Sequence, residues 1–150
     1  MTISALLSPQ RIFLDVDISS KKKLLEYIAD TVAEKTQLSQ STIFNNLLER
    51  ERLGSTGLGR GFAVPHARLP ELETTTACFF RLKQAVNFEA PDNEPVDLVF
   101  SIIIPEQATD EHLQILSALA GIFSQVDVCQ AIREAASADD VFQIIQSAEQ

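Results

Sequence analysis

His66 and His112 are the only two histidines of the chain, and His66 directly follows Pro65 in the stretch GSTGLGRGFAVPHAR. Proline fixes its own φ and pushes the residue before it into an extended conformation, so we expect this imidazole to be held in a set direction at a strand end. A neutral imidazole held in that way can attack with one ring nitrogen while the other is tied to a backbone carbonyl. His66 is therefore a candidate nucleophile, and an ordinary structural histidine is the alternative.

The segment before this histidine is rich in glycine: four of the chain's five glycines lie between residues 54 and 61. Glycines let backbone N–H groups point into a cavity, and Ser55 and Thr56 add hydroxyl donors. Arg50, one helical turn before the loop, offers a fixed positive charge with a planar fork of donors. The pattern predicts a cradle for an anion, with the backbone at Gly57 among its donors.

Two other interpretations of the glycine-rich loop compete with this one. A nucleotide-binding loop is disfavoured, because no Gly-Lys-Ser/Thr ending is present and the glycines follow a predicted helix and enter a predicted strand. That order is the reverse of a dinucleotide-binding fingerprint. A helix-to-strand link that needs glycine only for its backbone conformation stays open as the structural alternative.

His112 is the second candidate, because it falls in the first turn of a helix that we expect to start near Asp110. Helix N-termini attract anions through free N–H groups and the helix dipole. If this helix start converges with His66, a phosphoryl group on His66 meets cationic and dipolar stabilisation. An exposed helix residue without a special role is the alternative for His112.

The sequence lacks the full set of residues that other kinds of catalytic site require. Two histidines without a clustered cysteine or carboxylate do not make a zinc site, and no G-x-S-x-G stretch supports a hydrolase triad. We therefore expect neither a metal nor a cofactor.

Composition indicates one domain, residues 1–150, with a net charge of −9 that argues against nucleic acid or an anionic membrane as a partner. Basic protein partners are favoured, or none. Cys78 and Cys129 lie in apolar surroundings, and we expect both to be buried and reduced, as in a cytoplasmic protein. The N-terminus has no basic leader and no segment has about 18 consecutive apolar residues, so we expect no signal peptide and no membrane insertion.

Periodicity predicts strands interspersed with helices. The expected strands cover residues 11–18, 62–64, 74–82 and 96–104, with a short one at 86–88, and the expected helices cover 21–35, 41–53, 110–123, 127–135 and 137–147. This order predicts an α/β domain with a central mixed β-sheet and helices on both faces. The Lys21–Lys23 run fits poorly, because it lies at the positive end of a helix dipole.

Residues 50–68, RERLGSTGLGRGFAVPHAR, closely resemble the active-site segment of EIIA domains of the bacterial phosphoenolpyruvate-dependent sugar phosphotransferase system. The resemblance is to the fructose/mannitol type (type 2) and its free-standing nitrogen regulatory relative. Residues 93–123 are similar to that family's central strand, loop and second-histidine helix, and residues 140–145 to its terminal helix. A central mixed sheet with helices on both faces is implied by the resemblance too.

The resemblance also implies roles for individual residues. His66 aligns with the histidine that is phosphorylated, expected at Nε2, and Arg50 with the arginine that lines the phosphoryl site. His112 aligns with the second histidine beside the active one. Residues 55–57 occupy loop positions expected to help hold the phosphoryl oxygens. We expect His66 in an open, shallow depression rimmed by apolar residues, where a donor can reach it.

The implied function is that of a phosphohistidine phosphocarrier, a phosphotransferase that accepts its phosphoryl group from HPr or a nitrogen-branch HPr-like carrier. Its phosphorylation state is then expected to regulate nitrogen or potassium related targets such as sensor kinases and potassium transporters. A chain of 150 residues without a transporter part favours this type. The alternative is a sugar-specific fructose/mannitol EIIA component that passes the phosphoryl group to an EIIB domain during sugar uptake. A glycine-rich scaffold without phosphorylation is a third, weaker hypothesis.

Overall fold

Six strands form one sheet in the part of the chain that the computed structural model describes, residues 2–107 and 109–149. They are β1 (Ile12–Val16), β2 (Gly57–Gly59), β3 (Phe62–Ala63), β4 (His66–Leu69), β5 (Thr76–Val86) and β6 (Val96–Pro105). The order is β1-β5-β6-β3-β2, with β4 also paired to β6. β1 pairs in parallel with β5, and β3 and β4 with β6, whereas β5 and β6 are antiparallel. The predicted mixed sheet is confirmed.

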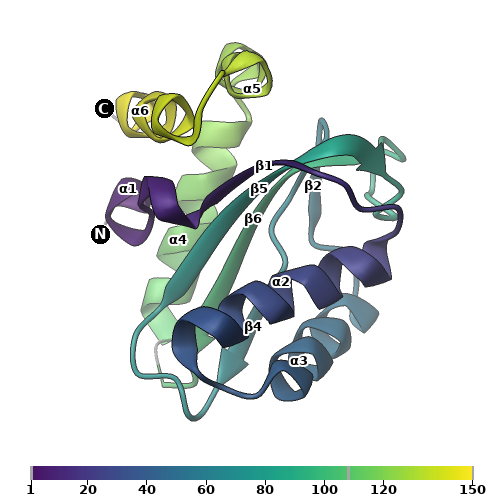
Figure 1. Ribbon diagram of the computed structural model, residues 1–150, viewed down its shortest axis with the longest axis vertical. Coiled ribbons are helices and arrows are strands. Elements are labelled where there is room, and N and C mark those ends of the chain that lie inside the picture. Colours follow the sequence, from purple (N-terminus) through teal and green to yellow (C-terminus); the bar gives the residue numbers. More distant parts are fainter. Residues whose placement is uncertain (1, 108, 150) are drawn as a thin grey trace.

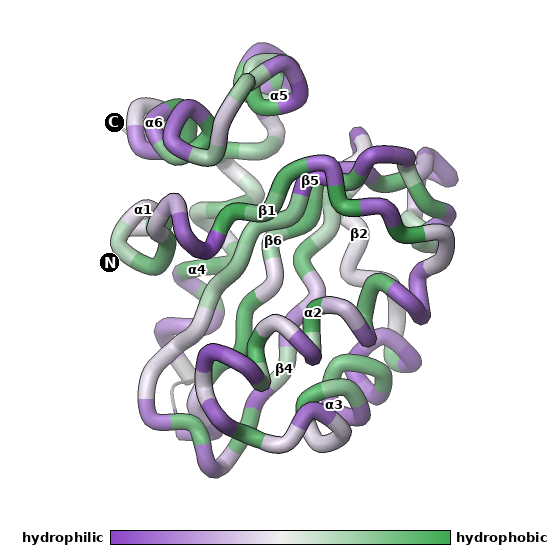
Figure 2. Tube along the Cα trace, in the orientation of Figure 1, coloured by the Kyte–Doolittle hydropathy of each residue, from purple (hydrophilic) through white to green (hydrophobic). Residues whose placement is uncertain are grey.

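Helices cover both faces of this sheet (Figure 1). On one face lie α2 (Lys21–Thr36) and α3 (Gln40–Arg52), and on the other α1 (Ile3–Leu6), α4 (Thr109–Phe123), α5 (Val126–Glu134) and α6 (Ala138–Ala148). Successive strand residues point to opposite faces, so Phe80 joins the core under α2 and Phe79 the core under α4. In Figure 2 much of β6 is coloured hydrophobic, as expected for a strand covered on both faces.

The long helices begin where the sequence predicts. The Ser20 hydroxyl accepts from the Lys23 backbone N–H at the start of α2, and Ser137 does the same for Asp140 at the start of α6. The lysine at the start of α2 also has a partner. Lys21 Nζ lies 2.9 Å from Glu51 Oε2, so its ammonium group forms an ion pair with a buried carboxylate.

The structure corrects the expected strand boundaries between residues 54 and 88. Part of the glycine-rich loop is a strand, β2, which pairs antiparallel with β3. His66 is the first residue of β4, which hydrogen-bonds in register with β6. The separate strand expected at 86–88 is absent, because β5 continues to Val86 after a register shift against β6. The short helix α1 was not predicted from the sequence.

Two further expectations concern burial and membranes. Cys78 and Cys129 are buried and unpaired, as predicted. Among the helices that the structure describes, none alone has the length and apolar character to cross a membrane, although Asp110–Phe123 and Val126–Glu134, bent by 81°, meet those criteria as a pair.

Gly57 is required by close packing, and Gly57→Ala is expected to lower the free energy of unfolding by about 1–3 kcal/mol. A Cβ atom there would lie 2.8 Å from the Ala90 Cβ and 3.2 Å from its Cα, so the backbone has to shift. Urea unfolding measures the change. Gly121→Ala is the matched control: a Cβ at Gly121 in α4 meets nothing within 4 Å, so stability should rise slightly. Equal effects of the two substitutions would contradict the packing argument.

Candidate active site

The His66 ring is held at both nitrogens. Nδ1 lies 2.9 Å from the carbonyl oxygen of Val64, and a carbonyl can only accept, so Nδ1 carries the proton. The Nε–H of Arg50 donates to Nε2 over 3.3 Å, which requires a lone pair on Nε2. Both contacts therefore assign the same neutral tautomer, with Nε2 as the nucleophilic nitrogen.

Arg50 reaches this ring from the last turn of α3. Its Nη1 also donates to the carbonyl oxygen of Gly54 over 2.9 Å, so the guanidinium is tethered to the start of the glycine-rich loop. Gly54 ends the helix with a φ of 150°. The sequence placed Arg50 one turn before the loop, and the structure shows that this spacing brings the guanidinium onto the His66 ring.

His112 lies on the other side of the site, in the first turn of α4. Its ring packs edge-on against the His66 ring, with centroids 4.8 Å apart and an interplanar angle of 66°. The structure therefore brings together the three candidates His66, Arg50 and His112.

Arg68 is a functional candidate that the sequence reasoning missed. Its Nη2 lies 2.9 Å from His112 Nδ1. The available signal was strand alternation, because residues two apart in a strand point to the same face, and His66 and Arg68 both belong to β4. Reading β4 as beginning at His66 would have identified the arginine.

Burial and neighbouring cations keep both rings neutral. Burial lowers the pKa of His66, helped by the charge of Arg50, although the Val64 carbonyl opposes the shift. The pKa of His112 falls to about 4, first through burial and then through the charges of His66, Arg68 and Arg50. A neutral His66 at physiological pH has an unprotonated Nε2, whose lone pair accepts from Arg50 in this structure.

These shifts predict that the free energy of unfolding falls as the pH is lowered from about 6.5 towards 4. The two histidines have pKa values below 6.5 in the folded chain, so in this range the unfolded chain binds more protons and is favoured. Urea unfolding at stepped pH measures the slope. His112→Gln should remove part of it, and an unchanged slope would show that the pKa of His112 is not depressed.

The donors of residues 55–57 are already used by other groups of the protein. The Ser55 hydroxyl donates to the Phe88 carbonyl over 3.0 Å and accepts from the Gly57 N–H over 3.1 Å. The Thr56 hydroxyl and backbone N–H both donate to the buried carboxylate of Glu51. The expected role of Ser55, Thr56 and Gly57 in holding phosphoryl oxygens is thus unsupported by these hydrogen bonds, which instead fix the shape of the loop.

The expected open depression is wrong, because the His66 side chain is nearly covered, at 7% exposed. The Arg50 guanidinium lies on its Nε2 and the His112 ring lies against its face. Arg50 and His112 are both half-buried, and both cover the His66 ring with their side chains rather than with their backbone.

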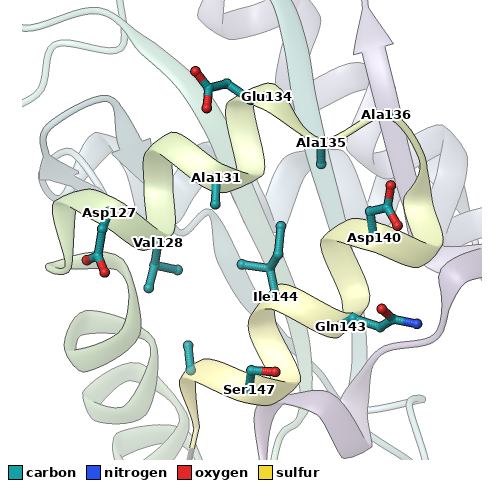
Figure 3. A pocket seen from close by; sticks show the side chains of 11 residues that line it. Asp127, Val128, Ala131, Glu134, Ala135, Ala136, Asp140, Gln143, Ile144 and Ser147 are labelled. Atoms are coloured by element: carbon teal, nitrogen blue, oxygen red, sulfur yellow. The ribbon is translucent and has the colours of Figure 1, made fainter.

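A larger hollow lies elsewhere, in a groove of about 860 Å³ between α5 and α6. Figure 3 shows Val128, Ala131 and Ile144 in this groove, with Glu134 and Asp140 near its rim. It contains none of the candidate site residues, so cavity size does not locate the site. Among the residues that the structure describes, no group of three or more His, Cys, Asp or Glu is placed to hold a metal ion.

Comparison with known proteins identifies the family. Residues 5–148 match the model of the "Phosphoenolpyruvate-dependent sugar phosphotransferase system, EIIA 2" family. The nitrogen regulatory protein of Pseudomonas aeruginosa is 41% identical over 144 residues, which span 95% of this chain and 94% of that protein. The fructose-specific EIIA component of Haloferax volcanii is 31% identical, with 95% and 94% covered.

The fold agrees with this match. The crystal structure of nitrogen regulatory protein IIA-Ntr from Neisseria meningitidis superposes with a TM-score of 0.91 at 41% identity, covering 95% of this chain and 98% of that one. The stronger likeness is thus to nitrogen regulatory proteins rather than to sugar-specific components. The chain belongs to the EIIA 2 family of the phosphoenolpyruvate-dependent sugar phosphotransferase system.

Proposed function

We propose that the chain is a regulatory phosphocarrier that accepts a phosphoryl group on Nε2 of His66. The observation that carries this proposal is the pair of hydrogen bonds that assigns the tautomer: Nδ1–H donates to the Val64 carbonyl, and Nε2 accepts from Arg50. An imidazole in this state is a nucleophile that needs no base, because it has no proton to lose from the attacking nitrogen.

The donor is a phosphohistidine carrier similar to HPr or its nitrogen-branch counterpart. The Nε2 lone pair of His66 attacks the phosphorus atom, the N–P bond of the donor breaks, and the donor nitrogen recovers its lone pair. The proton on Nδ1 stays in place against the Val64 carbonyl. Such a transfer depends on in-line positioning and charge stabilisation, since no proton moves and no metal is needed for balance.

Arg50 provides the charge stabilisation in this scheme. In the resting structure its Nε–H occupies the lone pair that has to attack. When the donor arrives, this hydrogen bond breaks and the guanidinium turns its donors to the phosphoryl oxygens. At 3.3 Å this hydrogen bond is long, so in this scheme it gives way to the stronger contact with a charged phosphoryl oxygen. The tether to the Gly54 carbonyl keeps the guanidinium nearby.

Two exposed leucines mark the surface on which the donor would dock. Leu53 is 85% exposed beside Gly54, and Leu113 is 69% exposed next to His112. Large apolar side chains left in water around a covered nucleophile favour contact with the apolar patch of a partner. The two leucines support the part of the sequence-based expectation that concerns apolar residues near the site.

Leu113→Asp is expected to raise the donor concentration needed for half-maximal transfer about tenfold, because it places a charge in the docking surface. The maximal rate and the fold should change little, since this side chain is exposed. Rates of label transfer at increasing donor concentration measure the effect. Val126→Asp is the control: Val126 is 66% exposed but begins α5, beyond the far end of α4. The docking assignment is wrong if both variants behave alike.

The regulatory part of the proposal follows from charge and from the relatives. A phosphoryl group adds about −1.5 to −2 charges at one spot, which can create or abolish a contact with a target protein. The relatives with the highest identity quoted above carry the name nitrogen regulatory protein, so we propose nitrogen or potassium related targets, such as sensor kinases or potassium transporters. A sugar-specific role, with transfer to an EIIB domain, is the less supported alternative.

Incubation with phosphoenolpyruvate and the general carrier proteins tests the proposal, and we expect stoichiometric, acid-labile and base-stable label on the chain. The labelled protein is then isolated and mixed with EIIB domains. Label that stays on the chain and is lost only by slow hydrolysis supports a regulatory switch. Rapid passage to an EIIB domain supports the sugar-specific alternative, and the absence of any label would refute phosphorylation.

A further inference from the structure

The two ring nitrogens of His112 lie in different surroundings. Nδ1 is 2.9 Å from Nη2 of Arg68. A guanidinium only donates and stays charged at any pH at which the protein is folded, so Nδ1 must accept, and the proton of the neutral ring lies on Nε2. His112 therefore has the tautomer opposite to that of His66.

The Nε2–H of His112 is buried and has no hydrogen-bond partner among the residues that the structure describes. Leaving a buried donor unsatisfied is unfavourable, and such donors are rare in folded proteins. This one belongs to the ring that packs against His66, the proposed phosphoacceptor. The exposed oxygens of a phosphoryl group on His66 would supply the acceptor that it lacks.

Arg68 is itself held in place. Its Nη1 donates to the Glu106 carbonyl over 3.3 Å, at the turn that follows β6. Its backbone pairs with Ile104 in the parallel ladder between β4 and β6. The arginine is thus fixed by the sheet at one end and by a backbone carbonyl at the other, which gives its contact with His112 a defined direction.

We propose that Arg68 is a positioning residue that holds His112 as an Nε2–H donor towards the phosphoryl group on His66. The inference rests on the proposed phosphorylation of His66. On this view the two histidines use the same atom in complementary ways: Nε2 of His66 attacks, and Nε2–H of His112 donates to a phosphoryl oxygen. Arg68 acts through His112 and does not itself need to touch the phosphoryl group.

The pKa of His112 agrees with a neutral donor. Because it is depressed to about 4, with Arg68 among the causes, the ring does not gain a second proton at physiological pH. The positive charge of the site then comes from arginine, while His112 contributes a directed hydrogen bond. Without Arg68 neither ring nitrogen would be favoured by a charged donor, and the proton could reside on either.

Three variants test this role. Arg68→Met removes the donor at similar side-chain length, Arg68→Lys retains a charged donor, and Arg52→Met removes a charge from an exposed arginine that pairs with Glu49. The first readout is the tautomer of His112 from 15N NMR of the imidazole nitrogens in the unphosphorylated protein. The chain has only two histidines, so the ring spectrum is simple to assign. The second readout is the rate of phosphoryl transfer to His66.

We expect Nε2–H in the wild type, a mixture of tautomers in Arg68→Met and an about tenfold slower transfer in that variant. Arg68→Lys should restore the tautomer and most of the rate, and Arg52→Met should change neither. The inference is overturned if wild-type His112 carries its proton on Nδ1, or if either readout is unchanged in Arg68→Met. Wild-type protein that takes no label at all refutes the proposed function instead, because the tautomer is measured without phosphorylation.

Discussion

Replacing His66 by alanine is expected to abolish phosphoryl transfer to the chain, leaving no acid-labile, base-stable label after incubation with phosphoenolpyruvate and the carrier proteins. The only other imidazole, His112, presents a protonated Nε2, and its Nδ1 lone pair is occupied by Arg68. In this tautomer the Nε2 of His112 has no lone pair with which to attack, so we expect no second phosphoacceptor in the site. Radiolabel on the isolated chain, quantified against wild type, measures the effect.

Two controls accompany this prediction. His112→Ala should still take label, at a reduced rate, because it removes a donor and keeps the nucleophile. His66→Gln fills more of the site than alanine and should be equally unlabelled, which separates loss of the nucleophile from a cavity in the fold. Label retained by His66→Ala would overturn the assignment of the phosphoacceptor.

Local chemistry explains why the sequence could predict how the backbone presents the proposed site. Pro65 precedes His66, the proposed phosphoacceptor, and its own carbonyl accepts from the Ile102 N–H of β6 over 3.0 Å, so the start of β4 is fixed on the sheet. The sequence predicted a strand at residues 96–104, and β6, which its apolar, β-branched run forms, supports β4. These features depend on neighbouring residues, which is why periodicity and turn chemistry predict them.

Long-range packing explains what could not be predicted. The contact between Arg68 and His112 joins residues 44 apart in sequence, and no local pattern indicates which nitrogen the arginine meets. The sequence suggested that the hydroxyls of Ser55 and Thr56 were available to a ligand. In the structure they donate hydrogen bonds to the Phe88 carbonyl and the Glu51 carboxylate.

The burial of His66 was not predicted, for a similar reason. The sequence places His66 at a strand end, where an open position is the simple expectation. Its coverage comes from two side chains on helices of opposite faces of the sheet, Arg50 of α3 and His112 of α4, which both contact the His66 ring. This long-range assembly has no signature in the order of residues.

The second large effect is expected at Arg50, where substitution by methionine should slow phosphoryl transfer on the order of a hundredfold while the fold is retained. The guanidinium is the one cation that contacts His66 Nε2 in the described residues, so its loss removes charge stabilisation where the transferred group must lie. Quenching the transfer reaction at successive times, with saturating donor, gives the rate of phosphoryl transfer. Urea unfolding measures the stability of the variant. Arg52→Met, two residues on and exposed, is the matched control and should transfer at the wild-type rate.

Two further measurements distinguish a catalytic from a structural role of Arg50. Because its charge helps to lower the pKa of His66, that pKa should rise in Arg50→Met and stay low in Arg50→Lys. Lysine retains a cation but not the planar fork, so Arg50→Lys should recover part of the rate and not all of it. Arg50 also tethers the Gly54 carbonyl at the end of α3. Two results would show that this tether is the only role of Arg50. One is unfolding of Arg50→Met, and the other is a wild-type transfer rate together with a wild-type His66 pKa in that variant.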